Sequence, residues 1–133
     1  MKKDFLFELI IPSKILVSDS FHMVVVPGEE GDFGILKDHS NFISQIRPGL
    51  LQTYKNNKVD KEFVLYGGFA EATSEKLIVL SEEAYDKSQF NLKKEKEKIS
   101  DLEDKIKKSK DEKEISYIQT KIQRIEKIID ILN

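Results

Sequence analysis

The stretch Phe5-Leu6-Phe7-Glu8-Leu9-Ile10-Ile11 alternates with a period of two, and its odd-numbered residues are all apolar. This spacing predicts a β-strand with one continuous apolar face. Similar short apolar runs follow, and turn residues such as Pro27-Gly28 and Pro48-Gly49 separate them. Among these runs are Phe21–Val26, Phe42–Ile46, Leu50–Tyr54, Glu62–Tyr66 and Phe69–Thr73. Eight or nine such runs in about 80 residues, without a helical pattern between them, predict an antiparallel sandwich or barrel.

Two glycine- or asparagine-rich pairs indicate how these strands are connected. Asn56-Asn57 lies between two strand-like runs and predicts the tip of a β-hairpin. Gly67-Gly68 interrupts a later run and predicts a bulge or a sharp bend.

The apolar period changes near residue 91 to the alternating spacing of three and four that is typical of a helical seam. Between the two apolar runs, Lys107–Glu114 has no apolar residue and predicts an exposed turn, and Ser109 with Glu112 fits a capping box for the second helix. We therefore expect an antiparallel two-helix hairpin. The predicted seam comprises Leu92, Ile99, Leu102, Ile106, Ile115, Ile118, Ile122, Ile125 and Ile129.

Charge also divides the chain into two predicted domains. Residues 1–86 hold 9 basic and 14 acidic side chains, a net charge of −5, whereas residues 87–133 hold 13 basic and 10 acidic side chains, a net charge of +3. All glycines and prolines precede residue 69. We predict a β-sandwich over residues 1–86 and a helical hairpin over residues 87–133.

Composition excludes several classes of protein. The chain has 133 residues, a net charge of −2 and no cysteine, so it offers neither a disulfide scaffold nor a cysteine nucleophile. Two histidines are too few for a three-histidine metal site. No apolar run approaches the roughly 18 residues of a membrane span, and no apolar signal core follows the start. We expect a protein of cytoplasmic character.

The segment Gly28–Gly34 contains three glycines and three acidic residues, a composition that invites comparison with ligand-binding loops. A phosphate loop leads into a helix and carries a lysine, and this segment does neither. Glu29, Glu30 and Asp32 also lack the spacing of a helix–loop–helix calcium site. An acidic turn that faces solvent or a partner is the favoured interpretation.

Two further patterns carry little chemical information. Asp38-His39-Ser40 holds the residue types of a hydrolytic triad, but sequence neighbours point in different directions, so a triad is not expected. Lys93–Lys113 mixes both charge signs and no aromatic lies among its lysines, which favours a solvated helix face over contact with nucleic acid.

Four motifs precede the helical hairpin, and they are Val26–Leu36, Asp38-His39, Arg47–Leu51 and Tyr66–Glu71. In this order and spacing they resemble the epsilon subunit of the bacterial rotary ATP synthase, whose mitochondrial counterpart is called delta. The resemblance covers nearly the whole chain. It implies a β-sandwich of about ten strands followed by two helices.

The resemblance also implies partners. They are the gamma subunit, the ring of c subunits and, when the hairpin extends, the alpha/beta catalytic hexamer, at the cytoplasmic face of the bacterial inner membrane. By motif position, Glu30, Asp32 and His39 correspond to residues that face the c-ring in the family. Lys37–Asn41 keeps this histidine but departs from the family's Pro-Gly-His-Ala-Pro turn.

The resemblance implies a non-catalytic subunit that couples rotation to proton flow and restrains ATP hydrolysis through its helices. Some relatives bind ATP through an Asp-x-x-Arg-Ala motif, but Phe90–Lys96 lacks both the aspartate and the Arg-Ala pair, so we expect no tight ATP site and no cofactor. A free-standing scaffold or adaptor built on a similar sandwich is the alternative, and stoichiometric binding to gamma discriminates between the two.

Overall fold

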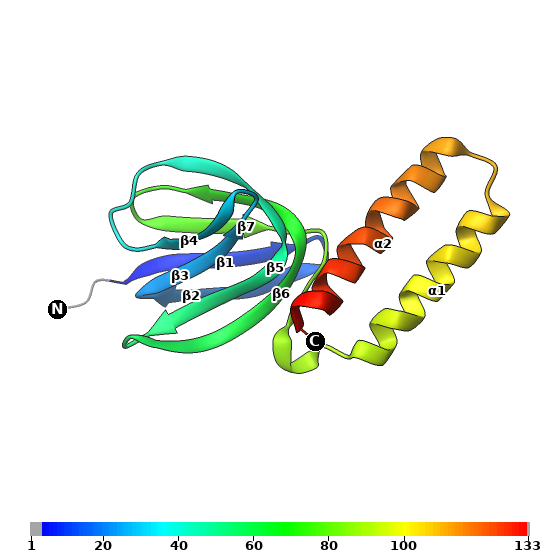
Figure 1. Cartoon of the computed structure of the whole chain (residues 1–133). Helices are drawn as coiled ribbons and strands as arrows, with labels where there is room; N and C mark the ends of the chain where they lie inside the picture. The colour runs from blue at the N-terminus through cyan, green and yellow to red at the C-terminus, as the bar shows by residue number, and fades with distance from the viewer. Residues whose placement is uncertain (1–3, 133) are drawn as a thin grey trace.

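The computed structural model describes residues 4–132 as a β-rich body with a helical hairpin at one end (Figure 1). This arrangement confirms the predicted β-sandwich followed by two helices. The elements are β1 (Phe5–Ile11), β2 (Lys14–Phe21), β3 (Met23–Gly28), β4 (Gly31–Ile35), β5 (Phe42–Lys55), β6 (Lys58–Ala72), β7 (Lys76–Leu80), β8 (Ala84–Asp86), a 3₁₀ turn (Lys87–Gln89), α1 (Leu92–Lys108) and α2 (Glu112–Leu132).

The eight strands form one sheet, in which seven follow the order β2-β1-β7-β6-β5-β3-β4 and β8 pairs with β6 outside this path. The count is lower than the expected ten because β5 and β6 are long strands of 14 and 15 residues, each of which joins two predicted runs. Pro48 lies within β5 opposite Tyr66, and the Tyr66 N–H donates to the Glu83 carbonyl at 3.1 Å instead of to β5. At this position no hydrogen bond from Pro48 to β6 is needed, so β5 continues through the proline.

Gly67 and Gly68 bend β6 where it changes neighbours, as the sequence predicted. Residues 63–65 of β6 pair with β8, and residues 69–72 pair with β7. Gly67 has a φ of +110° and Gly68 a φ of +136°, values that side-chain-bearing residues rarely adopt. A Cβ on Gly68 would lie 2.0 Å from the Leu80 carbonyl oxygen, so β7 occupies the space of a side chain.

One strand pair departs from the purely antiparallel prediction, since β1 and β7 are parallel. A parallel pair needs a long crossover connection, and β2 to β6 supply it here. The β5–β6 hairpin turns at Asn56-Asn57, with φ values of 52° and 64°, and this two-residue turn confirms the predicted tip.

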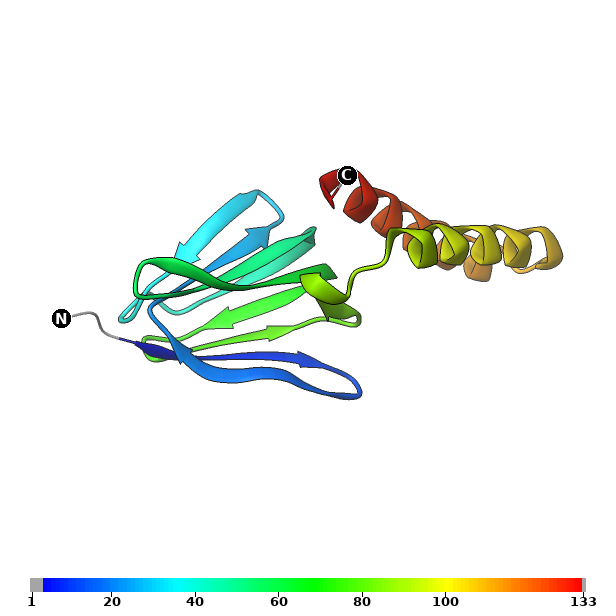
Figure 2. The same cartoon turned by 90° about the horizontal axis from the view of Figure 1, so that it is seen from below.

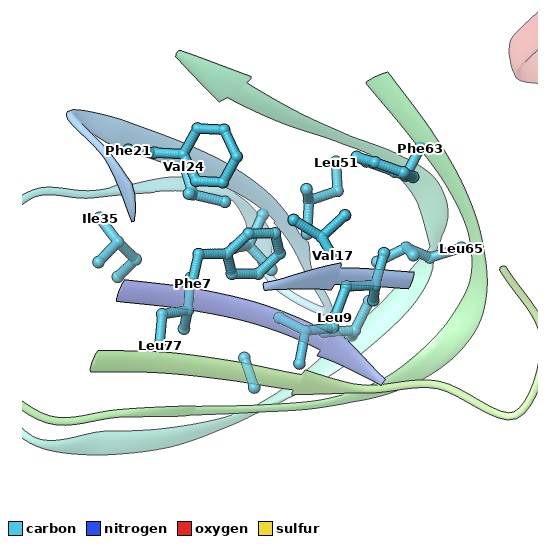
Figure 3. Packing of buried hydrophobic residues seen from close by; sticks show 14 of the residues in the cluster. Phe7, Leu9, Val17, Phe21, Val24, Ile35, Leu51, Phe63, Leu65 and Leu77 are labelled. Atoms are coloured by element: carbon cyan, nitrogen blue, oxygen red, sulfur yellow. The ribbon is translucent and has the colours of Figure 1, made fainter. Parts of the chain in front are cut away.

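The main core lies between the two layers of the folded sheet, and Figure 3 shows its side chains converging from separate strands. In β1, Phe5, Phe7 and Leu9 are at most 3% exposed, so the period-two pattern identified the inward face. Further strands contribute a dense aliphatic and aromatic set, including Val17, Phe21, Val24, Val26, Ile35, Ile46, Leu51, Phe63, Leu65, Leu77 and Val79.

The two helices form an antiparallel pair, and α2 also contacts β5 and β6 on the outside of the sandwich. Figure 2 shows the pair projecting from the end of the sheet, with the connection from β8 leading into α1. A second apolar cluster fills this junction, and it comprises Val64, Tyr66, Ile125, Ile128 and Ile129 with the partly buried Leu50, Tyr85, Phe90, Leu92, Ile99, Leu102 and Leu132.

The helix boundaries are set by short polar side chains. The Asn91 carboxamide oxygen accepts from the Lys94 N–H at 3.1 Å and caps α1. The predicted Ser109–Glu112 capping box is wrong: Ser109 is the C-cap of α1, and the Asp111 carboxylate accepts from the Lys113 N–H at 3.0 Å at the start of α2. The acidic residue is an equally good cap, which the four-residue pattern could not distinguish.

Candidate partner-binding surfaces

The acidic turn between β3 and β4 presents negative charge to solvent. Glu29 and Glu30 lie exposed at its tip, and neither forms an ion pair within residues 4–132. The turn is held in place because the Glu29 N–H donates to the Gln45 carbonyl at 2.9 Å. Arg47 binds the base of the turn, donating to the Asp32 carboxylate and to the Gly28 carbonyl, each at 2.5 Å. The charge of Asp32 is thereby balanced, and the two glutamates supply the negative potential.

His39 does not join this acidic group. Its ring packs edge-on against Phe5 and Phe42, with centroid distances of 5.8 and 6.3 Å, and Nδ1 lies 3.2 Å from the Ser40 carbonyl oxygen. Asp32 is the second residue of β4, whereas His39 lies four residues beyond its last residue, so about 10 Å of strand and a short loop separate them along the chain. Glu30 and Asp32 share one surface, and His39 lies at the other end of the strand.

An exposed apolar row crosses the outer face of the sheet. Phe69 of β6 pairs with Leu80 of β7, Leu80 with Ile10 of β1, and Ile10 with Ile15 of β2. Phe69, Leu80 and Ile15 are 55%, 51% and 56% exposed, unusually high for large apolar side chains that lie side by side. Sequence reasoning missed this outer row because its members come from four different strands, whose register the pattern does not specify.

The outer row continues into a groove of about 830 Å³ between the end of the sheet and α2. Its floor is mainly apolar and includes Ile46 and Pro48 as well as members of the outer row. Arg124 and Lys127 of α2 line the side nearest the helices. The rim also includes Arg47 and the acidic Glu29 and Glu82. The groove therefore combines an apolar floor with charges of both signs at its rim, a composition suited to a protein partner that carries charged residues beside apolar ones.

The predicted helical seam lies at the helix pair and its junction with the sheet. Each of the nine seam residues is buried or half-buried, and Ile118, Ile125 and Ile129 are at most 8% exposed. The seam omits Ile128, which is 1% exposed. Because α2 packs on α1 with one side and on the sheet with another, it needs a wider apolar face than a two-helix seam.

Polar side chains cross the same junction. Lys98 of α1 donates to Glu83 and to Tyr85 of the sandwich, both at 3.1 Å, and to Glu95 of its own helix at 2.9 Å. Burial opposes the charge of Lys98, but these hydrogen bonds outweigh that effect and raise the pKa of the ammonium group above its usual value. Burial also raises the pKa of Tyr66, and the nearby Glu95 carboxylate adds to this shift.

Neither a metal centre nor a membrane span stands out in the part of the chain that the structure describes. Residues 4–132 contain no group of three or more His, Asp or Glu side chains placed to hold a metal ion. Neither helix in this range combines the length and apolar character needed to cross a membrane.

The chain is similar to ATP synthase subunits in sequence. The family described as the ATP synthase delta/epsilon chain β-sandwich domain matches residues 4–87. The ATP synthase epsilon chain of Rhodospirillum rubrum is 37% identical over 108 residues, 81% of each chain. The epsilon chain of Rhodospirillum centenum is 36% identical over 132 residues, which cover 95% of this chain and 90% of that relative.

Solved structures share the fold. A chain of the Euglena gracilis mitochondrial ATP synthase superposes with a TM-score of 0.73 at 19% identity, over 98% of this chain and 82% of that one. A chain of the Tetrahymena thermophila mitochondrial ATP synthase central stalk and c-ring gives 0.55 at 16% identity, over 66% and 70%. The sequence matches decide the assignment: this chain belongs to the ATP synthase delta/epsilon family and resembles its bacterial epsilon chains.

Proposed function

We propose that the chain is a non-catalytic subunit of the central stalk that binds gamma through the outer row and its groove. The observation that carries this proposal is the outer row itself. Three large apolar side chains, Phe69, Leu80 and Ile15, are more than half exposed on a sheet whose other face is a closed core. Leaving such a surface in water is unfavourable, so a permanent partner is expected to cover it.

The acidic turn supplies the second contact, with the ring of c subunits. Glu29 and Glu30 project from a turn whose position is held by Arg47 and by the Glu29–Gln45 hydrogen bond. A rigid, acidic projection suits polar or basic loops on a rotating ring, because charge complementarity sets orientation without a large apolar area. The similarity to chains of mitochondrial assemblies described as containing a c-ring supports this role.

His39 is assigned to the ring surface only by motif position. Its packing against Phe5 and Phe42 makes a structural role at the far end of β4 equally consistent with the geometry. Glu30 and Asp32 are therefore the stronger candidates for ring contact, and Asp32 acts together with Arg47.

The helical hairpin is assigned to restraint of ATP hydrolysis. Residues 87–133 carry a net charge of +3, which favours an acidic surface on the alpha/beta hexamer once the hairpin leaves the sandwich. In this scheme the docked hairpin permits hydrolysis and the extended hairpin slows it. Within the complex, the chain lies at the cytoplasmic face of the inner membrane as a peripheral subunit.

The experiment that tests gamma binding replaces two members of the outer row. In the double variant Phe69→Asp/Leu80→Asp, carboxylates would face the apolar surface of gamma, and we expect its affinity for gamma to fall about tenfold or more. The control is Val59→Asp, at another exposed apolar side chain, 44% exposed and outside the outer row. Binding is measured by titrating purified gamma from the same organism against each variant.

Equal affinity of the parent and the double variant would remove the outer row from the interface. Absence of a stoichiometric complex between the parent chain and gamma would overturn the stalk assignment and favour the adaptor alternative.

A further inference from the structure

The junction between α1 and the sandwich contains a carboxylate in an unexpected place. Glu95 is the only buried residue of α1 and is 4% exposed, although its helix is otherwise dominated by exposed charge. One oxygen, Oε1, accepts a hydrogen bond from Lys98, whereas Oε2 has no hydrogen-bond partner within residues 4–132. The Tyr66 hydroxyl is likewise buried without such a partner there, and it lies near enough to the Glu95 carboxylate for that carboxylate to raise the pKa of Tyr66. A buried carboxylate in this condition opposes docking of the helix.

Lys98 offsets the unfavourable burial of the Glu95 carboxylate. Its ammonium group has three protons, and it donates to Glu95 of α1 and to Glu83 and Tyr85 of the sandwich. The same nitrogen lies 5.0 Å from the centre of the Tyr85 ring, and the Tyr85 hydroxyl donates to Glu83 at 2.6 Å. Two carboxylates, one from each side of the junction, therefore share one cation.

We propose that Lys98 is an electrostatic latch that sets the balance between the docked and undocked hairpin. With Lys98 in place, Glu83 and Glu95 are both within 3.1 Å of a positive charge, and the junction closes. Without this ammonium group, the buried Glu95 carboxylate has no hydrogen-bonded cation and repels Glu83, whose side chain is 38% exposed, across the junction. The apolar contacts of α2 favour docking of the hairpin, and docking also requires the positive charge of Lys98 between the two carboxylates.

The latch also explains why docking can be reversible. In an entirely apolar junction, every group that leaves water would favour docking. Glu95 instead favours undocking, because its carboxylate regains its hydration when the helix leaves the sandwich. The connection from β8 to α1 is short and consists of the 3₁₀ turn Lys87–Gln89 with Phe90 and Asn91, and Figure 2 shows it leading from the sandwich into α1. Its consequence for ATP hydrolysis rests on the function proposed above, whereas the docking equilibrium belongs to the isolated chain.

The test measures docking directly. The chain has no cysteine, so cysteines introduced at Asp60 of β6 and Lys110 of the helix–helix turn, both exposed, can carry two spin labels on the full chain. Pulsed electron resonance then gives the distance distribution between sandwich and hairpin, and hence the ratio of docked to undocked molecules. Hydrogen exchange of the β1 amides shows in the same samples that the sandwich is folded.

We expect Lys98→Met to lower the ratio of docked to undocked molecules about tenfold or more, because two carboxylates lose their shared counter-ion. The double variant Lys98→Met/Glu95→Leu removes the repulsion and the buried charge, so docking recovers to within about threefold of the parent. The matched control is Lys96→Met, an exposed lysine of the same helix, which changes the ratio by less than about threefold.

If Lys98→Met has the same ratio of docked to undocked molecules as Lys96→Met, the latch proposal is overturned. A double variant that stays as undocked as Lys98→Met also overturns it, since loss of packing by the lysine stem would then account for the effect. Because these measurements use the isolated chain, they are decided independently of gamma binding, and a failure of the stalk assignment would leave their outcome unchanged.

Discussion

Replacing Gly68 with alanine tests the bend that joins the two halves of the sheet. The φ of +136° is unfavourable for alanine and costs about 1–3 kcal/mol. The new Cβ would also lie 2.0 Å from the Leu80 carbonyl oxygen, a backbone atom that moves only if β7 shifts, and such overpacking costs about 1–3 kcal/mol more. We therefore expect Gly68→Ala to lower the free energy of unfolding by about 2–6 kcal/mol.

Gly31→Ala is a matched control for this substitution. Gly31 has nearly the same φ, +135°, but nothing lies within 4 Å of the position that its Cβ would occupy, so only the backbone cost applies. Urea unfolding followed by circular dichroism gives both values, and the difference between them measures the clash with β7. If Gly68→Ala destabilises the protein no more than Gly31→Ala, the close approach of β7 does not constrain the bend and the reasoning is refuted.

Three further predictions concern the hairpin. Ile128→Ala empties a buried site in the junction, so α2 amides should lose protection from hydrogen exchange at least tenfold while β1 amides do not; equal loss in both would contradict a separate junction. The pKa values of Tyr66, Tyr85 and Lys98 are raised in the docked chain, so their protonated forms favour docking, and this contribution is complete below the ordinary values of 10.0 and 10.5. Spin-label distances should therefore change only above about pH 10, and undocking between pH 6 and 9 would disagree. Calorimetry should detect no submillimolar binding of ATP, because Phe90–Lys96 lacks the Asp-x-x-Arg-Ala motif; a clear isotherm would refute this.

The parts of the fold that depend on neighbouring residues could be predicted from sequence. The alternation of β1, the Asn56-Asn57 turn and the apolar positions of the helices all follow from local periodicity. The parallel pairing of β1 with β7 depends on residues about 70 positions apart, and no local pattern carries that information. Likewise, the sequence indicated strand ends around Pro48 that the structure joins, because the Tyr66 N–H found its acceptor in Glu83 rather than in β5.

The candidate surfaces divide in the same way. The acidic turn was visible because its glutamates are adjacent, whereas the outer row needs the register of four strands. The interpretation of Lys93–Lys113 as a solvated face is wrong at Glu95, which is buried, and incomplete at Lys98, which bridges to the sandwich. In a segment with 23 charged positions among 47 residues, no local pattern distinguishes the one ion pair whose carboxylate is buried.

The most direct test of the account reconstitutes gamma and the alpha/beta hexamer with the full chain or with a truncation after Asp86. The described residues of the main core all precede Asp86, so the truncated sandwich keeps that core. We expect the truncated chain to bind gamma with unchanged stoichiometry while ATP hydrolysis rises, since the outer row lies entirely on the sandwich and the hairpin supplies the restraint. Loss of gamma binding on truncation, or an unchanged rate of hydrolysis with gamma still bound, would contradict this division of roles.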